Sequence, residues 1–391
     1  MPALAPAPAA PARPPVAGAI APGYFEGTLP PALILAAFAL VTLPMVALSA
    51  VAPTHLLLWG YVWLFGMTHF VVTLTVYLQG ANLRHFWGTW PRRLLFFGAP
   101  VALFVAFDLV AAFGVRAAFP VFALGFLAAV RLFDFFHFNR QSFGVLQMFK
   151  GRTGVRFPAR LKRCENGAFL ALTALLFTTF LAGGLCPLLQ PGGWLSLADF
   201  GPPPADAVFP LDALQGIAAA ALLTALGLLA AAAVGLVRTC RAADRPVGLG
   251  FALAYLGVQA ASALIGAVSL PLYIAALAVH YVEYHVLMAP RCFRVPLDPA
   301  WRVDRAFAAL RANRVVFAAA VVALAGLVTA CGAVGMAAMG RLDAAAPSGY
   351  LAVVAVFDGL FVFHYLVEMF IWRFSDPHFR KQLGGLYFAA K

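Results

Sequence analysis

The sequence predicts an all-α fold: a polytopic integral membrane bundle of about ten transmembrane helices with both termini in the cytoplasm. The composition is the first reason, because 63% of the 391 residues are hydrophobic and 11% are charged, whereas soluble domains carry roughly 25% charged residues. The second reason is that apolar runs of about twenty residues recur along the chain. These runs are continuous rather than alternating, so a transmembrane barrel is not expected. A soluble enzyme, a coiled coil and a disordered protein are excluded.

Three regions follow from the distribution of apolar residues. Residues 1–25 are rich in Ala and Pro and predict a disordered tail, 26–375 form the transmembrane domain, and 376–391 form a cytoplasmic C-terminal tail. The fourth span ends in mixed polarity, so we expect its helix to cross the bilayer and protrude. The expected spans are 30–52, 56–80, 93–115, 117–149, 166–187, 209–238, 248–268, 270–289, 313–339 and 349–373.

Basic residues give the third reason and set the orientation. The net charge is +12, and 24 of the 27 Lys and Arg residues fall in the tails and connections that this topology places on one side. Arg116 and Arg341 fall on the other side, and Arg131 lies within a span. Because cytoplasmic loops of membrane proteins are rich in Lys and Arg, the positive charge indicates orientation and not a nucleic-acid partner. A multi-pass protein of a bacterial inner membrane, or of another membrane facing the cytoplasm, is expected.

Ionisable residues inside apolar helices are costly and usually functional. Four expected spans each place a histidine at a similar level in the cytoplasmic half of the bilayer. Three of them lie roughly 13–17 Å from its surface at 1.5 Å per helical residue, and that of the fourth span lies about twelve residues from the end of its helix. These histidines are His69, His137, His280 and His364.

Three of the four histidines have a carboxylate on the same helical face. Asp134 and His137 are three residues apart, as are His280 and Glu283, and His364 and Glu368 are four apart. Helical bundles build metal centres from inward-facing side chains of this kind. We therefore expect a metal site whose ligands are His69, His137, His280, His364, Glu283 and Glu368.

Iron, with one or two ions, is the expected metal, because nitrogen and oxygen ligands without thiolates suit it and a site within the bilayer suggests redox chemistry on a dissolved substrate. Zinc, copper and haem stay open. Glu283 and Asp134 are candidate proton-handling groups, and Arg140 is a candidate for an acidic head group or a substrate carboxylate. The five cysteines have no metal-ligand spacing.

Several of these residues have a plain structural interpretation. Arg131 and Asp134 are expected to form a local ion pair on one helix, and Asp108 and Asp358 to make hydrogen bonds between helices. His85 and His285 are each expected to be either an additional metal ligand or, more simply, a residue at a contact between helices.

The histidine arrangement is similar in general design to that of membrane carotenoid-cleaving dioxygenases, which use single histidines from different spans around iron. The HxxxH and HxxHH boxes of membrane fatty-acid desaturases are absent from the sequence. The likeness does not include a shared sequence motif, and it does not indicate that the chain belongs to this family.

The preferred function is a membrane oxidoreductase of the oxygenase, hydroxylase or desaturase type, acting in lipid metabolism on a lipid-soluble substrate. A haem-binding electron-transfer protein, an ion- or proton-coupled transporter and a non-catalytic assembly subunit remain alternatives. Membrane lipids and a separate electron donor are the expected partners, since the sequence has no dinucleotide fingerprint.

Overall fold

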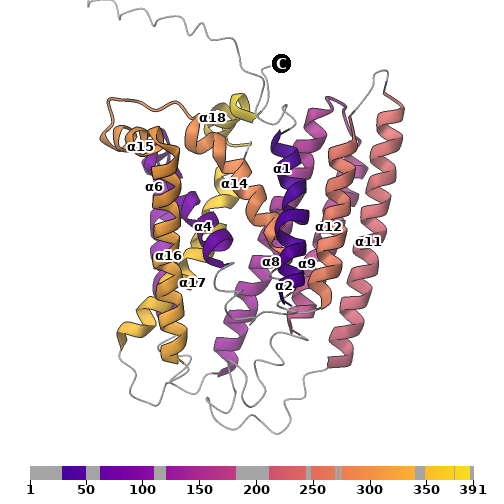
Figure 1. Ribbon diagram of the computed structural model, residues 1–391, viewed down its shortest axis with the longest axis horizontal. Coiled ribbons are helices and arrows are strands. Elements are labelled where there is room, and N and C mark those ends of the chain that lie inside the picture. The colour runs from indigo at the N-terminus through magenta and orange to yellow at the C-terminus, as the bar shows by residue number, and fades with distance from the viewer. Residues whose placement is uncertain are drawn as a thin grey trace, which may run out of the picture.

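All regular secondary structure in the described part of the chain is helical, as predicted (Figure 1). The computed structural model describes residues 29–49, 62–109, 120–181, 211–243, 248–268, 272, 275–339, 348–373 and 375–387. The predicted tail at residues 1–25 and His55 lie outside these ranges.

The first part of the bundle is made of short, interrupted helices. The segments are α1 (Leu29–Ala37), η2 (Phe38–Thr42), α2 (Leu43–Ser49), η3 (Val62–Met67), α4 (Thr68–Thr73), η4 (Leu74–Leu78), α5 (Gly80–Trp87), α6 (Trp90–Arg93), η5 (Leu94–Gly98) and α7 (Ala99–Leu109).

Prolines explain two of the interruptions. Pro44 follows the π-helical η2, and Pro100 follows the π-helical η5. A proline ring clashes with the carbonyl four residues earlier. In the turn before each proline, the backbone hydrogen bonds therefore join residues that are five apart instead of four. The amide of Leu43 accordingly donates to the carbonyl of Phe38.

Two sharp bends redirect the chain at the ends of apolar helices. Gln79 is extended and separates Trp63–Leu78 from Gly80–Trp87 by 79°. Asp304 stabilises the helix that follows, because its Oδ1 accepts a hydrogen bond from the Gly80 amide at 2.6 Å. A second bend of 104° separates Arg302–Ala312 from Arg314–Ala330.

The remaining helices are longer. They are α8 (Pro120–Arg152), α9 (Ala159–Thr179), α11 (Leu211–Arg241), α12 (Gly250–Val268), α14 (Ala278–Phe293), α15 (Arg302–Ala312), α16 (Arg314–Met339), α17 (Ser348–Ile371) and α18 (Pro377–Tyr387). The predicted fourth span is thus one continuous helix, α8, of 33 residues.

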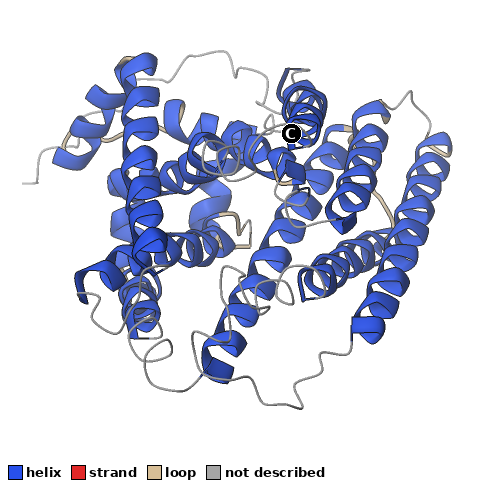
Figure 2. Cartoon of the chain, turned by 60° about the horizontal axis from the view of Figure 1, so that its bottom comes forward, coloured by secondary structure: helices blue, strands red, loops and turns tan. Residues whose placement is uncertain are grey.

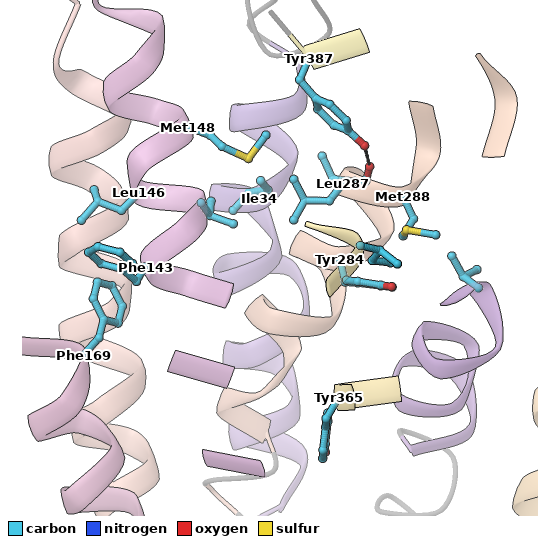
Figure 3. Close-up of a cluster of buried hydrophobic side chains, with 14 of the residues drawn as sticks. Ile34, Phe143, Leu146, Met148, Phe169, Tyr284, Leu287, Met288, Tyr365 and Tyr387 are labelled. Carbon is cyan, nitrogen blue, oxygen red and sulfur yellow. Dashed lines mark hydrogen bonds between the residues drawn. The ribbon is translucent and has the colours of Figure 1, made fainter. Parts of the chain in front are cut away.

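The helices gather on two sides of α8 and α14. In Figure 1, α9, α11 and α12 lie on one side, and α4, α16 and α17 lie on the other. Figure 2 shows the same helical bundle from a second direction. One apolar cluster contains residues from both sides and includes Phe143 and Phe169 at the α8–α9 contact (Figure 3). The predicted C-terminal tail contains α18, which docks on α14 because the Tyr387 hydroxyl donates to the Leu287 carbonyl.

The described residues support fewer membrane spans than the ten predicted. Two helices, Leu29–Leu48 and Ala213–Arg241, are long and apolar enough to cross a membrane, and the number rises to four if each bent pair is one span. The bends at Gln79 and near Asn313 divide long apolar stretches, and α14 has only 16 residues. The ten-span topology is therefore not confirmed.

Candidate metal centre

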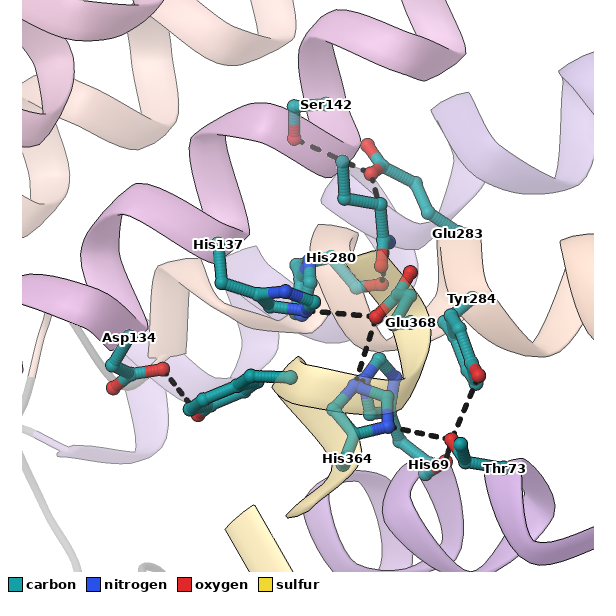
Figure 4. A network of polar contacts seen from close by, with 12 residues as sticks. His69, Thr73, Asp134, His137, Ser142, His280, Glu283, Tyr284, His364 and Glu368 are labelled. Carbon is teal, nitrogen blue, oxygen red and sulfur yellow. Dashed lines mark hydrogen bonds and ion pairs between the residues drawn. The ribbon is translucent and has the colours of Figure 1, made fainter. Parts of the chain in front are cut away.

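Four buried side chains from three separate parts of the chain converge at the centre of the bundle. α4 supplies His69, α8 supplies His137, and α17 supplies both His364 and Glu368 (Figure 4). One potential ligand atom from each side chain lies within 4.8 Å of the others. We call these four residues the His₃Glu group.

The contacts within the His₃Glu group are short. His69 Nε2 lies 2.8 Å from His364 Nε2. Glu368 Oε2 lies 2.8 Å from His137 Nε2 and 3.0 Å from His364 Nε2. No member of the group is more than 5% exposed.

The geometry and the donor set of the group could hold a metal ion. His137 Nε2 and Glu368 Oε2 are both buried without a partner in hydrogen-bond geometry, although they lie 2.8 Å apart. Buried polar atoms are nearly always hydrogen-bonded, and an exception needs an explanation. A cation that both atoms face provides one. Imidazole nitrogens and a carboxylate are ordinary ligands for zinc, iron, copper or manganese.

Neighbouring residues hold the ligands in place. Thr73 lies one turn after His69, and its Oγ1 contacts His364 Nδ1 at 2.5 Å and the Tyr284 hydroxyl at 2.7 Å. A partner on Nδ1 fixes the tautomer and the ring orientation, which leaves Nε2 for an ion. Tyr365 packs against His137 with ring centroids 4.4 Å apart. None of these three supporting residues was predicted, although Thr73 follows His69 on the same helical face and could have been.

His280 lies beside the group but outside it. Its ring centroid is 4.9 Å from that of His69 and 5.6 Å from that of His137. Its Nδ1 is buried without a hydrogen-bond partner. His280 is therefore near enough to join the site after a side-chain rearrangement.

Glu283 has a different environment from the four grouped residues. Its Oε1 accepts a hydrogen bond from the Tyr255 hydroxyl at 2.5 Å. Its Oε2 accepts from Ser142 Oγ at 3.3 Å and from Gln141 Nε2 at 3.5 Å. The same Gln141 amide donates to the His280 carbonyl at 3.1 Å. Glu283 is thus surrounded by neutral donors, in a hydrogen-bond network that reaches the backbone of His280 through Gln141.

Asp134 and Arg140 do not reach the His₃Glu group. Asp134 forms the predicted ion pair with Arg131 at 3.6 Å and accepts a hydrogen bond from the Tyr365 hydroxyl. It touches the site only through Tyr365, which packs on His137. The exposed Arg140 donates to Asn166 of α9.

The other two histidines have ordinary partners. His285 Nδ1 donates to the Tyr281 carbonyl at 2.7 Å, and its Nε2 contacts Thr68 Oγ1 at 3.1 Å. His85 contacts Asp376 at 3.3 Å and stacks on His378 beside α18. The side chains of Asp108 and Asp358 lie outside the described part of the structure.

Burial and the neighbouring His85 lower the pKa of His378 to about 4. This imidazole is therefore neutral near pH 7. The His85–His378 contact belongs to the docking of α18 and not to the metal centre.

The comparisons with known proteins return no match for this chain, whether the search is against protein-family models, curated proteins or solved structures.

Proposed function

We propose that this protein is an integral membrane oxidoreductase of the oxygenase, hydroxylase or desaturase type, with iron held by the His₃Glu group and a lipid-soluble substrate. The observation that carries the proposal is the convergence of three imidazole Nε2 atoms and one carboxylate oxygen in a buried site, two of them without hydrogen-bond geometry. Bound iron would supply the redox chemistry.

Iron is favoured among the possible metals because four side chains leave part of a six-coordinate shell free. Non-haem iron oxygenases use two histidines and one carboxylate with open positions in the same way. A closed structural zinc site would use four ligands as well, but it would leave no open position for a substrate.

The protein's own residues divide the remaining work. Glu368 and His137 hold the ion from two different helices, and Thr73 orients His364 through Nδ1. Glu283 would hold a proton for the reaction, since it is a second buried carboxylate beside the site and its hydrogen bonds come from neutral donors. The surrounding aromatic rings, among them Phe70 and Tyr365, would keep water from the reacting atoms.

A haem centre fits these distances less well. Two axial histidines must leave space between them for the planar macrocycle, but His69 Nε2 and His364 Nε2 are 2.8 Å apart. The distance supports a non-haem ion between side chains.

Metal quantification with an optical spectrum tests the proposal. The protein purified in detergent should hold about one or two iron ions per chain and show no Soret band. His364→Ala should remove most of this iron, because His364 contacts two other members of the group. His285→Ala is the matched control, since His285 lies on neighbouring α14 and bonds to Tyr281 and Thr68 instead.

Three results would reject the proposal. They are iron below about 0.2 per chain in carefully purified protein, a strong Soret band, and full iron retention in His364→Ala. Zinc in place of iron would support the metal centre but reject the proposed oxidoreductase activity.

A further inference from the structure

An apolar groove runs along the contact between α8 and α9 and is separate from the His₃Glu group. Its volume is about 580 Å³, and its walls include Leu132, Phe133 and Phe136 of α8 and Leu170 and Phe177 of α9. This volume lies in the range of small-molecule sites, which are mostly apolar and orient their ligand with few polar groups.

The walls of the groove offer nothing to a polar ligand. The two polar residues among its lining side chains are Thr173 and Thr178. Thr173 donates to the Phe169 carbonyl at 3.0 Å, and Thr178 donates to the Ala174 carbonyl at 2.8 Å. Both hydroxyls therefore bond to their own helix, and a polar group placed in the groove would lose its hydrogen bonds to water without replacement. The apolar walls therefore favour a hydrocarbon ligand.

A cationic group lies just beyond one end of the groove. Arg140 is one helical turn after Phe136, and Asn166 is one turn before Leu170. The guanidinium of Arg140 donates to Asn166 Oδ1, so the two residues bridge α8 and α9 at this end. The Phe143 ring lies 4.9 Å from the same guanidinium. Both partners are neutral, and the exposed charge is available to an anion.

The wall of the groove leads toward the metal centre. The ring of Phe133 packs against Tyr365 with centroids 5.9 Å apart, and Tyr365 packs against His137 at 4.4 Å. Phe133 lies seven residues before Arg140, or roughly 10 Å along the helix. Phe133 and Tyr365 thus connect the wall of the groove to His137 through ring contacts.

We propose that this groove binds a long-chain carboxylic acid, with the hydrocarbon chain between α8 and α9 and the carboxylate at Arg140. The planar guanidinium matches a carboxylate with two parallel hydrogen bonds. A single groove with a cation beyond its end suits one hydrocarbon chain with one head group, which is the form of a fatty acid. The role of this acid as a substrate of the metal centre rests on the proposed function, whereas its binding does not require the metal.

Equilibrium binding of a radiolabelled C18 fatty acid to the chelator-treated protein in detergent tests the site. We expect saturation near one acid per chain, and at least tenfold weaker binding of the methyl ester. Arg140→Gln should weaken binding of the acid at least tenfold and leave binding of the ester unchanged. Arg302→Gln is the matched control, because Arg302 is also exposed but lies on α15.

A second variant tests the groove itself. Ala174 lines the groove and is exposed, so Ala174→Trp should fill the groove without disturbing the core and abolish binding of acid and ester alike. The proposal is overturned if Arg140→Gln or Ala174→Trp binds the acid like the wild type, if the ester binds as tightly as the acid, or if a diacyl phospholipid displaces the acid at lower concentration. Iron is measured in the untreated samples, so acid binding without iron would reject the proposed function alone.

Discussion

Two buried glutamates, Glu165 and Glu368, show the difference between a closed ion pair and an open ligand site. Glu165 is completely buried, and Lys150 Nζ lies 2.7 Å from both of its oxygens, with Gln147 Nε2 at 2.9 Å. Glu368 is 4% exposed, and its Oε2 faces the imidazoles of His137 and His364 without hydrogen-bond geometry.

The comparison shows that the burial of a carboxylate does not by itself indicate a ligand-binding site. Glu165 has a permanent cation beside it and needs nothing further. Glu368 has only histidines, so a bound cation would supply the charge compensation that Lys150 gives to Glu165. Removing the carboxylate of Glu165 should therefore lower the stability of the fold. Removing the charge of Glu368 should instead lower the metal affinity and change the stability little.

The largest effect on stability is expected at the closed pair. Glu165→Leu leaves the ammonium of Lys150 buried without its carboxylate, and breaking a buried pair in this way costs about 3–5 kcal/mol. Denaturant titration in detergent micelles, followed by circular dichroism, measures the loss. The double variant Lys150→Met with Glu165→Leu should recover most of the stability. A single variant within about 1 kcal/mol of the wild type would contradict the comparison.

The open site should respond in metal affinity instead. Glu368→Gln keeps the shape of the side chain but removes the charged ligand, and we expect iron affinity to fall at least tenfold, since even outer partners of metal ligands contribute 10–100-fold. Metal titration of the chelator-treated protein checks this. Unfolding of the metal-free variant should differ from that of the wild type by less than about 1 kcal/mol.

Glu283→Gln is the matched control for this experiment, because Glu283 is also buried but is surrounded by hydroxyl and amide donors. Equal loss of metal in the two variants would show that the ligand set is wider than the His₃Glu group.

A smaller effect is expected at the hydrogen bonds of Glu283. Tyr255→Phe removes the hydroxyl that donates to Glu283 Oε1, and the loss of one buried hydrogen bond should cost about 1–2 kcal/mol. Iron content should not change, because Tyr255 does not contact the His₃Glu group. Denaturant titration and metal quantification on one preparation measure both quantities. A variant that loses iron would place Glu283 among the ligands.

The smallest effect is expected at α18. The folded pKa of His378 is about 4, below the value near 6.5 of an unfolded chain, because of burial, His85, Arg291 and Arg92, with Asp376 acting in the opposite direction. Between these values the unfolded state binds more protons. The contribution of His378 is therefore complete above pH 6.5 and is lost as the pH falls to 4.

Thermal unfolding across this pH range tests the effect. The Tm should fall as the pH is lowered from 6.5 to 4, and His378→Gln should make the fall shallower. An identical pH profile in the variant would remove His378 as the cause.

The helical class and most members of the candidate His₃Glu group could be predicted from the sequence, because hydrophobic periodicity and helix-face spacing are local properties. Four of the six predicted ligands form the His₃Glu group. Of the three expected pairs of a histidine with a carboxylate, His364 and Glu368 meet. Asp134 instead forms the ion pair with Arg131 that was also predicted, and Glu283 accepts a hydrogen bond from Tyr255.

The sequence by itself determined that this chain is helical and apolar, and that a small number of histidines lie inside it. Only the tertiary structure decided that Glu368 is shared between His137 and His364, that Glu283 belongs to a separate hydrogen-bond network, and that Arg140 faces Asn166 at the end of a groove. The reason is physical: spacing along a helix fixes which side chains share a face, but the neighbour that meets this face comes from helices distant in sequence, whose positions depend on the packing of the whole core.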